Sequence, residues 1–257
     1  MKAKYFFLTF IFLSTFGYGQ TYHNLSSGPL TQNWTNTALI TADNDWSGVT
    51  SFRGFGGNDI TSSTGIDPQT LLTEGTVTLN VKANQTNPNT YTSGGFGEFE
   101  ITNPVVAFQG SGTSDAPNLV IYLNTTGVTS IQVAYNLRDI DGSADNSIQP
   151  VALQYRVGTT GNFINIPSAF IADASSGPSL ATLVTPVSVT LPAGAENQSQ
   201  LQIRIITSNA VGNDEFIGID DISISGTVSE TPAISVSETS LTGFTYVEGS
   251  GPSAEQS

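Results

Sequence analysis

The sequence predicts an all-β domain of the sandwich type, and three observations support that class. Valine, isoleucine, threonine and aromatic residues dominate the apolar positions, helical periodicity is scarce, and clusters of Gly, Asn, Pro and Ser separate short apolar runs. In most of these runs apolar and polar residues alternate, as expected of strands that bury one face. Two such sheets packed face to face make a sandwich. The clearest expected strands are 76–82, 118–123, 131–137, 151–157, 187–191 and 201–207.

The segments between these strands have the composition of loops and turns. Residues 83–95 and 172–178 are rich in small and polar side chains and are expected to be loops. Residues 151–157 and 163–166 flank a glycine-containing segment, which predicts a β-hairpin. Residues 20–227 are long enough for one large all-β domain.

The first 19 residues have the three parts of a signal peptide. Lys2 and Lys4 give a positive start, residues 5–16 form an apolar run, and Gly17 and Gly19 provide a small-x-small exit. The apolar run is shorter than the roughly 20 residues that span a bilayer. We therefore expect a mature chain that begins at Gln20, is secreted or displayed at the cell surface, and has no transmembrane anchor.

The charge and cysteine content narrow the possible partners. Loss of Lys2 and Lys4 leaves 5 of the 7 basic residues against 21 acidic ones, a formal net charge of −16. Such a surface repels a phosphate backbone, so we expect no direct nucleic-acid binding by this region. It attracts divalent cations instead. The chain contains no cysteine, so its stability depends on its core and, as one option, on bound metal.

The composition changes after Thr227. Residues 228–232 are expected to form a linker, and apolar residues then alternate again within 233–257. Twenty-five residues cannot bury a core of their own, so we interpret 233–257 as the first strands of a second, truncated Ig-like domain. A disordered tail is the alternative.

The segment 212–224 predicts a β-bulge that carries two adjacent carboxylates. Ile217 and Ile219 share one strand face, but Ile222 and Ile224 share that face only if one extra residue is accommodated between the two pairs. The bulge falls at Asp220 and Asp221. It can turn one aspartate inward or aim both at one point, where a cation would offset the cost of a buried carboxylate.

Calcium is the metal that this oxygen-rich chain would bind, since it takes 6–8 oxygen ligands. The candidate ligands are acidic residues at the bulge and in two further clusters. They are Asp220, Asp221, Asp214, Asp43, Asp45, Asp139 and Asp141. The alternative for the last four is that they cap turns, as Asp and Asn often do.

Nucleophilic catalysis is disfavoured by the residues that the chain lacks. Ser-His-Asp and Cys-His arrangements need a histidine, and only His23 exists, near the mature N-terminus. Glu98 and Glu100 place two carboxylates on one strand face about 7 Å apart. Retaining glycosidases hold their pair at about 5–5.5 Å, so a carboxylate glycosidase is the weakest hypothesis and solvent-facing glutamates are the common explanation.

Aromatic side chains in loop-like stretches are candidate platforms for sugar rings. We expect most of them to be core residues. Trp46, beside Asp45, and Tyr91, in the Asn-rich loop, are the two expected to be exposed and to bind ligand.

Four stretches resemble an N-terminal module of secreted multidomain bacterial proteins: 83–90, 135–141, 149–157 and 213–221. The resemblance covers nearly all of residues 20–227. Related modules are attached to extracellular endonucleases, to other phosphoesterases, and to proteins with lamin-tail or Ig-like domains, and residues 232–257 are similar to the start of such an Ig-like repeat. The resemblance implies a jelly-roll-like antiparallel sandwich with an accessory role and no catalytic residues.

The leading hypothesis is therefore a secreted, non-catalytic accessory or adhesion module. It would bind an extracellular polymer or cell-surface ligand, with carbohydrate as a candidate, be stabilised by calcium, and act beside downstream domains of the same protein. The alternative is the N-terminal part of a secreted hydrolase, a nuclease or phosphoesterase, whose active site lies downstream.

Overall fold

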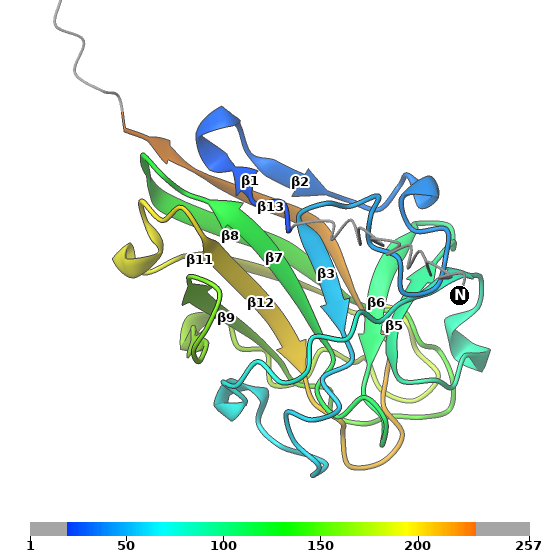
Figure 1. The fold of residues 1–257 in the computed structure, drawn as a ribbon. Helices are drawn as coiled ribbons and strands as arrows, with labels where there is room; N and C mark the ends of the chain where they lie inside the picture. Colours follow the sequence, from blue (N-terminus) through cyan, green and yellow to red (C-terminus); the bar gives the residue numbers. More distant parts are fainter. Residues whose placement is uncertain (1–19, 230–257) are drawn as a thin grey trace, which may run out of the picture.

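A computed structural model describes residues 20–229 and confirms the predicted class: two β-sheets form a sandwich (Figure 1). Within these residues there is no α-helix, and the helical elements are single 3-10 turns. None of the helices described is long and apolar enough to cross a membrane. The predicted leader 1–19, the predicted strands 233–257 and most of the linker 228–232 lie outside the described residues.

The first sheet contains six strands in the order β1-β7-β12-β9-β10, and β3 also pairs with β7. Their bounds are β1 His23–Asn24, β3 Phe52–Phe55, β7 Asn118–Asn124, β9 Val151–Val157, β10 Ile164–Asn165 and β12 Leu201–Thr207. All pairs are antiparallel except β1 with β7. The predicted hairpin is confirmed, because β10 pairs back on β9.

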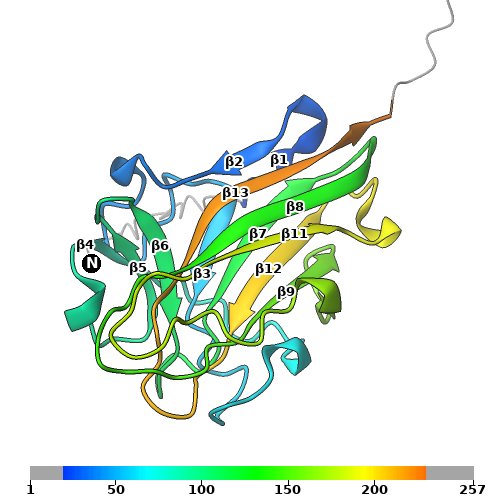
Figure 2. The ribbon, with the colours of Figure 1, turned by 180° about the vertical axis from the view of Figure 1, so that it is seen from behind.

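The second sheet contains seven strands in the order β11-β8-β13-β6-β5-β4, and β2 also pairs with β13. Their bounds are β2 Leu30–Gln32, β4 Lys82–Gln85, β5 Gly95–Phe99, β6 Val105–Gln109, β8 Val128–Asp139, β11 Val184–Thr190 and β13 Ile217–Val228. Figure 2 shows this sheet in front, with β7, β12 and β9 of the first sheet behind it. Only β4 and β5 pair in parallel.

Six single-turn 3-10 segments connect the strands. They are η1 Leu25–Ser27, η2 Thr37–Leu39, η3 Pro68–Thr70, η4 Pro88–Thr90, η5 Pro167–Ala169 and η6 Ala193–Ala195. Four of the six have an Asn or Asp cap whose side chain accepts a hydrogen bond from a backbone amide of the first turn, as Asn36 does from Ala38. The loops between β12 and β13 lie at the bottom of Figure 1, whereas β13 ends at its top left.

One expected strand is wrong. Residues 76–79 do not join a sheet, and β4 begins only at Lys82. The segment instead crosses the outer face of the first sheet, where Val77 is exposed and the Asn80 amide donates to the Gly54 carbonyl. The alternating pattern of residues 76–79 is that of a strand. The segment nevertheless pairs with the neighbouring strand β3 only through an isolated bridge between Leu79 and Phe55.

The core between the sheets is a single large cluster of aliphatic and aromatic residues. Ile121 and Ile203 of the first sheet and Val133 and Ile219 of the second are fully buried members of it. Alternation along each strand places these side chains inside and polar ones outside. The sandwich is therefore a rigid support for the loops at its ends.

Around Arg156 and Arg204 the outer face of the first sheet is polar and buried, and residues 66–75 cover it. Arg204 donates to the Thr73 carbonyl at 2.7 Å, and Arg156 forms an ion pair with Glu74 at 2.5 Å. Both guanidinium groups lie over the Phe163 ring, at 3.9 and 4.4 Å from its centroid. Burial lowers the pKa of Arg204 to about 9. These contacts hold residues 66–75 on the sheet.

Candidate functional site

The predicted bulge is present at Asp220 and Asp221. The pairing of β13 with β8 shifts register between Asp220 and Ser223, and Asp221 adopts a left-handed φ of 49°. The shift keeps both Ile219 and Ile222 in the core. Asp221 is exposed as a result, and Asp220 is buried.

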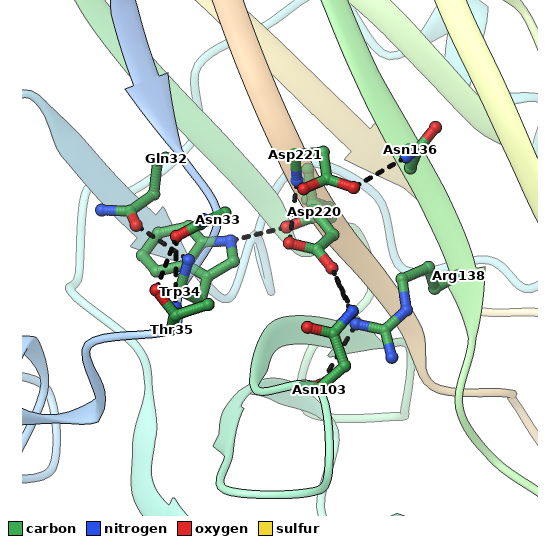
Figure 3. Close-up of polar contacts among 10 residues, drawn as sticks. Gln32, Asn33, Trp34, Thr35, Asn103, Asn136, Arg138, Asp220 and Asp221 are labelled. Atoms are coloured by element: carbon green, nitrogen blue, oxygen red, sulfur yellow. Dashed lines mark hydrogen bonds and ion pairs between the residues drawn. The ribbon is translucent and has the colours of Figure 1, made fainter.

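The two carboxylates of the bulge bind different protein groups (Figure 3). Asp220 Oδ2 accepts from Arg138 Nη1 at 2.7 Å and from Asn103 Nδ2 at 3.2 Å. Asp221 Oδ2 accepts from Asn136 Nδ2 at 3.0 Å. Burial raises the pKa of Asp220, while the Asp221 amide and the Arg138 guanidinium oppose that rise. The cation that meets the buried carboxylate is therefore a guanidinium of the protein itself.

Asp43 and Asp45 lie in an exposed loop, and each binds other groups of the protein. Asp43 pairs with Lys82 at 2.6 Å and accepts from the Ala83 amide at 3.1 Å. Asp45 accepts from the Ser47 amide at 2.8 Å, as a turn cap does. Hydrogen bonds from Lys82 and from Ser47, respectively, lower the pKa values of these two carboxyl groups. The turn interpretation describes Asp45, whereas Asp43 connects its loop to the start of β4.

The other predicted acids gather at the end of the sandwich where β8 finishes and β13 begins. Asp139 and Asp141 lie at and just after the end of β8, and Asp214 lies just before β13. Two residues outside the list of candidate ligands join them: Asp145, from the same acidic run as Asp139 and Asp141, and Glu215. No described Lys or Arg side chain forms an ion pair with any of the five.

Burial without a counter-ion raises the pKa values of four of these acids. The pKa of Asp214 rises to about 6 because of burial, against hydrogen bonds that favour its charge. The pKa of Glu215 rises to about 8, first through burial and then through the negative charge of Asp141. Burial also raises the pKa values of Asp139 and Asp141. Asp139, Asp141, Asp145, Asp214 and Glu215, which we call the end cluster, thus include four buried carboxyl groups with raised pKa values and no ion-paired base.

A hollow of about 340 Å³ opens beside the end cluster. Its polar lining comes from η4, the end of β6, the segment after β8 and the loop before β13. The side chains that the following argument uses are Asn89, Tyr91, Gln109, Asp141, Asp145 and Asn213. We call this the end hollow.

Hydrogen bonds between loops hold the end hollow in shape. Asn89 Oδ1 accepts from the Gly142 amide at 2.9 Å, and Asn213 Nδ2 donates to Asp145 Oδ1 at 2.8 Å. Gln109 Nε2 donates to the Asp214 carbonyl at 2.9 Å, and its Oε1 has no partner within the described chain. The hollow is therefore preformed by side chains from four segments far apart in the sequence.

The two aromatic residues expected to be exposed have different fates. The expectation for Trp46 is wrong: it is 1% exposed, donates from Nε1 to the Asn80 carbonyl at 3.2 Å and packs edge-on against Phe96. Tyr91 is partly buried against Phe99 and Phe216, and it lines the end hollow. Nothing in the local sequence distinguishes the two, because both follow polar loop residues.

Only one member of the glutamate pair faces solvent. Glu98 is 3% exposed and accepts from the Asn84 amide at 2.8 Å, whereas Glu100 is exposed. Burial raises the pKa of Glu98. A carboxylate enclosed by β4 and β5 lies in no described hollow with its partner, so the geometry gives no support to the glycosidase hypothesis.

The end cluster combines residues that the sequence pattern identified with residues that it missed. Asp214, Asp139 and Asp141 were predicted as ligands; the structure places Asp141 and Asp214 in the lining of the end hollow and Asp139 and Asp141 near Glu215. Asp145 and Glu215 lie in the same two motifs, so the signal was present as further acids in those motifs. Across residues 20–229, no three acidic or histidine side chains are arranged around one point as a metal coordination sphere.

Comparisons with known proteins describe what this sandwich is similar to. No family model matches the chain, and no curated protein does. Among solved structures, the K3 cleaved adhesin domain of Lys-gingipain from Porphyromonas gingivalis is 12% identical, with a TM-score of 0.42 over 76% of this chain and 98% of that one. The K2 adhesin domain has a TM-score of 0.41, at 12% identity, over 77% of this chain and 98% of that one.

A carbohydrate-binding module specific for non-crystalline cellulose, CBM28, is also similar. It is 13% identical, with a TM-score of 0.37 over 56% of this chain and 86% of that one.

Proposed function

We propose that residues 20–229 form a non-catalytic carbohydrate-binding module, an accessory part of a secreted or surface-displayed multidomain protein. The observation that carries this proposal is the end hollow, a preformed polar depression with a tyrosine in its lining. Loops on a rigid sandwich are a common place for binding residues. Its volume of about 340 Å³ is that of a small ligand site.

The side chains of the end hollow have the chemistry that a sugar requires. Asn89, Gln109 and Asn213 provide amide groups, each with two donors and an acceptor, and Asp141 and Asp145 provide carboxylate acceptors. Such groups can bond to neighbouring hydroxyls of one sugar ring. Tyr91 adds an aromatic surface for the apolar face of that ring. Because the loops are already tied together, little ordering is needed on binding.

Calcium belongs to this proposal at the end cluster rather than at the bulge. The support is that several buried acids from two segments face one another without an ion-paired base, whereas Asp220 has Arg138. Calcium would complete its 6–8 oxygen ligands with amide and backbone oxygens and draw the loops together. At a hundredfold excess over its Kd, calcium raises the free energy of unfolding by about 2.7 kcal/mol. A melting temperature that is identical in millimolar calcium and in chelator contradicts this part.

The sugar-binding proposal is tested by native affinity electrophoresis in gels that contain hydroxyethyl cellulose, xylan, galactomannan or amylopectin. We expect at least one polymer to retard residues 20–229, and Tyr91→Ala or Asn213→Ala to reduce that retardation by roughly tenfold in affinity. Ile164→Ala, at an exposed position of β10, is the matched control. Release of reducing ends from the retarding polymer would show catalysis instead. Retardation by none of the four rejects the proposal.

A further inference from the structure

A second hollow, of about 380 Å³, lies on the outer face of the first sheet, where β3 and β7 meet residues 74–79. We call it the face hollow. Six of its lining side chains matter here: Tyr22, Arg53, Phe55, Glu74, Tyr122 and Gln202. It shares no lining residue with the end hollow. Any ligand that it binds would occupy a separate site.

An aromatic wall forms one side of the face hollow. The Tyr22 and Tyr122 rings meet edge to face with centroids 5.5 Å apart. Phe55, Val120 and Tyr122 form a small apolar cluster that is separate from the main core, and Tyr22 packs against it. Aromatic residues outside the core, at the wall of a depression, present apolar surface that a sugar ring can cover.

The polar groups of the face hollow are held in place by the protein. Arg53 Nη1 donates to the backbone carbonyls of Trp46, Val49 and Phe52 at 3.2, 3.2 and 2.6 Å. Glu74 is fixed through Oε1 by Arg156, at 2.5 Å. A ligand therefore meets side chains whose positions are already fixed, so it loses little binding energy to ordering them.

The same residues keep unused hydrogen-bonding capacity. Within residues 20–229, Arg53 Nε and Nη2, Glu74 Oε2 and the hydroxyl groups of Tyr22 and Tyr122 make no hydrogen bond to protein. Donors and acceptors of both kinds thus surround an aromatic wall. This combination suits a ring that carries several hydroxyl groups.

We propose that the face hollow is a second saccharide site, specific for neutral sugars, so that one module holds a polysaccharide at two places. The saccharide class rests on the function proposed above. Neutrality follows from charge: Glu74 places a carboxylate in the hollow, and a chain with a formal net charge of −14 repels polymers of uronic acids. Two sites on one polymer increase retention without new contacts at either site.

The two sites offer a matched pair of substitutions, Tyr22→Ala in the face hollow and Tyr91→Ala in the end hollow. Isothermal titration with cellohexaose, xylohexaose, mannohexaose and maltohexaose measures the number of sites. We expect two sites per chain in the wild type and one in each variant. Glu74→Gln is a second face-hollow variant that removes no aromatic packing, and it should weaken the same site by roughly tenfold. Thermal melting of each variant, with Ile164→Ala as control, checks the fold.

The outcomes separate this inference from the proposed function. If Tyr22→Ala and Glu74→Gln bind with the wild-type stoichiometry and affinity while Tyr91→Ala loses its site, the face hollow is not a saccharide site and the proposed function stands. If only the face-hollow variants lose binding, the inference holds and the end hollow is wrong. Tighter binding of tetragalacturonic acid than of the neutral probes overturns neutrality. A wild type that binds no probe rejects both.

Discussion

Two acidic regions on the same stretch of chain are neutralised in different ways. At the bulge, Asp220 is 1% exposed and pairs with Arg138 at 2.7 Å. At the end cluster, six residues earlier, Asp214 and Glu215 are equally buried but have no described ion pair. Burial raises the pKa at both, and in the end cluster burial together with the negative charges of Asp141, Asp139 and Asp145 raises the pKa of Glu215 to about 8. At the bulge, the protein itself neutralises the buried carboxylate. In the end cluster, a proton or a cation must offset the charge of the buried carboxylates.

The largest effect on stability should come from removing the guanidinium group that pairs with Asp220. Arg138→Met leaves the Asp220 carboxylate buried with only Asn103 and the Asp221 amide beside it, and we expect a loss of about 3 kcal/mol in the free energy of unfolding, measured with urea. Adding Asp220→Asn to that variant should restore most of the loss, because no buried charge remains. A single Arg138→Met variant that matches the wild type would show that solvent already compensates Asp220.

The sequence predicts those features of the two acidic regions that depend on neighbouring residues, and it does not predict those that depend on distant ones. The bulge was predictable because the phase of Ile217, Ile219 and Ile222 is written along one strand. The partner of Asp220 was not, since Arg138 lies 82 residues earlier and reaches it only through the pairing of β13 with β8. The same limit applies to the acids: Asp43 pairs with Lys82, and Glu215 lies near Asp139 and Asp141 across the end of the sandwich.

Burial of aromatic residues was equally hard to predict. Trp46 follows an Asp-Asn-Asp run that indicates an exposed loop, but it is covered because β3 and Phe96 approach it from distant parts of the chain. Gly54 makes that approach possible: a Cβ there would lie 2.3 Å from the Trp46 ring. Alternation along a strand predicts which face is buried, but a loop residue carries no such period. The prediction of a strand at 76–82 was wrong for the converse reason: the sequence is periodic, but residues 76–79 pair with β3 only at Leu79.

The second prediction concerns the pH dependence of the end cluster. The folded-state pKa values of Asp214 and Glu215, about 6 and about 8, lie above their ordinary values of 3.8 and 4.5. The folded chain therefore holds protons that the unfolded chain releases, and stability falls as pH rises between about 4 and 8. We expect Asp214→Asn with Glu215→Gln to remove about 2 kcal/mol of that decline.

The measurement is the free energy of unfolding against pH in chelator, for the wild type and the double variant. Asp139, Asp141 and Asp145 face Glu215 and strengthen the decline, so the difference between the two chains isolates Asp214 and Glu215. Parallel curves for the two chains would mean that water reaches these carboxylates in the folded state.

The smallest effect should come from the backbone of the bulge. Asp221 has a φ of 49°, a left-handed conformation that Asp tolerates and a β-branched residue does not. We expect Asp221→Val to cost about 1–2 kcal/mol and Asp221→Gly to stay within about 0.5 kcal/mol of the wild type, because glycine relieves the strain while the bond from Asn136 is lost. Urea unfolding of both variants measures this. Equal destabilisation by Val and Gly would attribute the position to the Asn136 bond, so that the bulge would depend on a side chain as the Arg138 pair does.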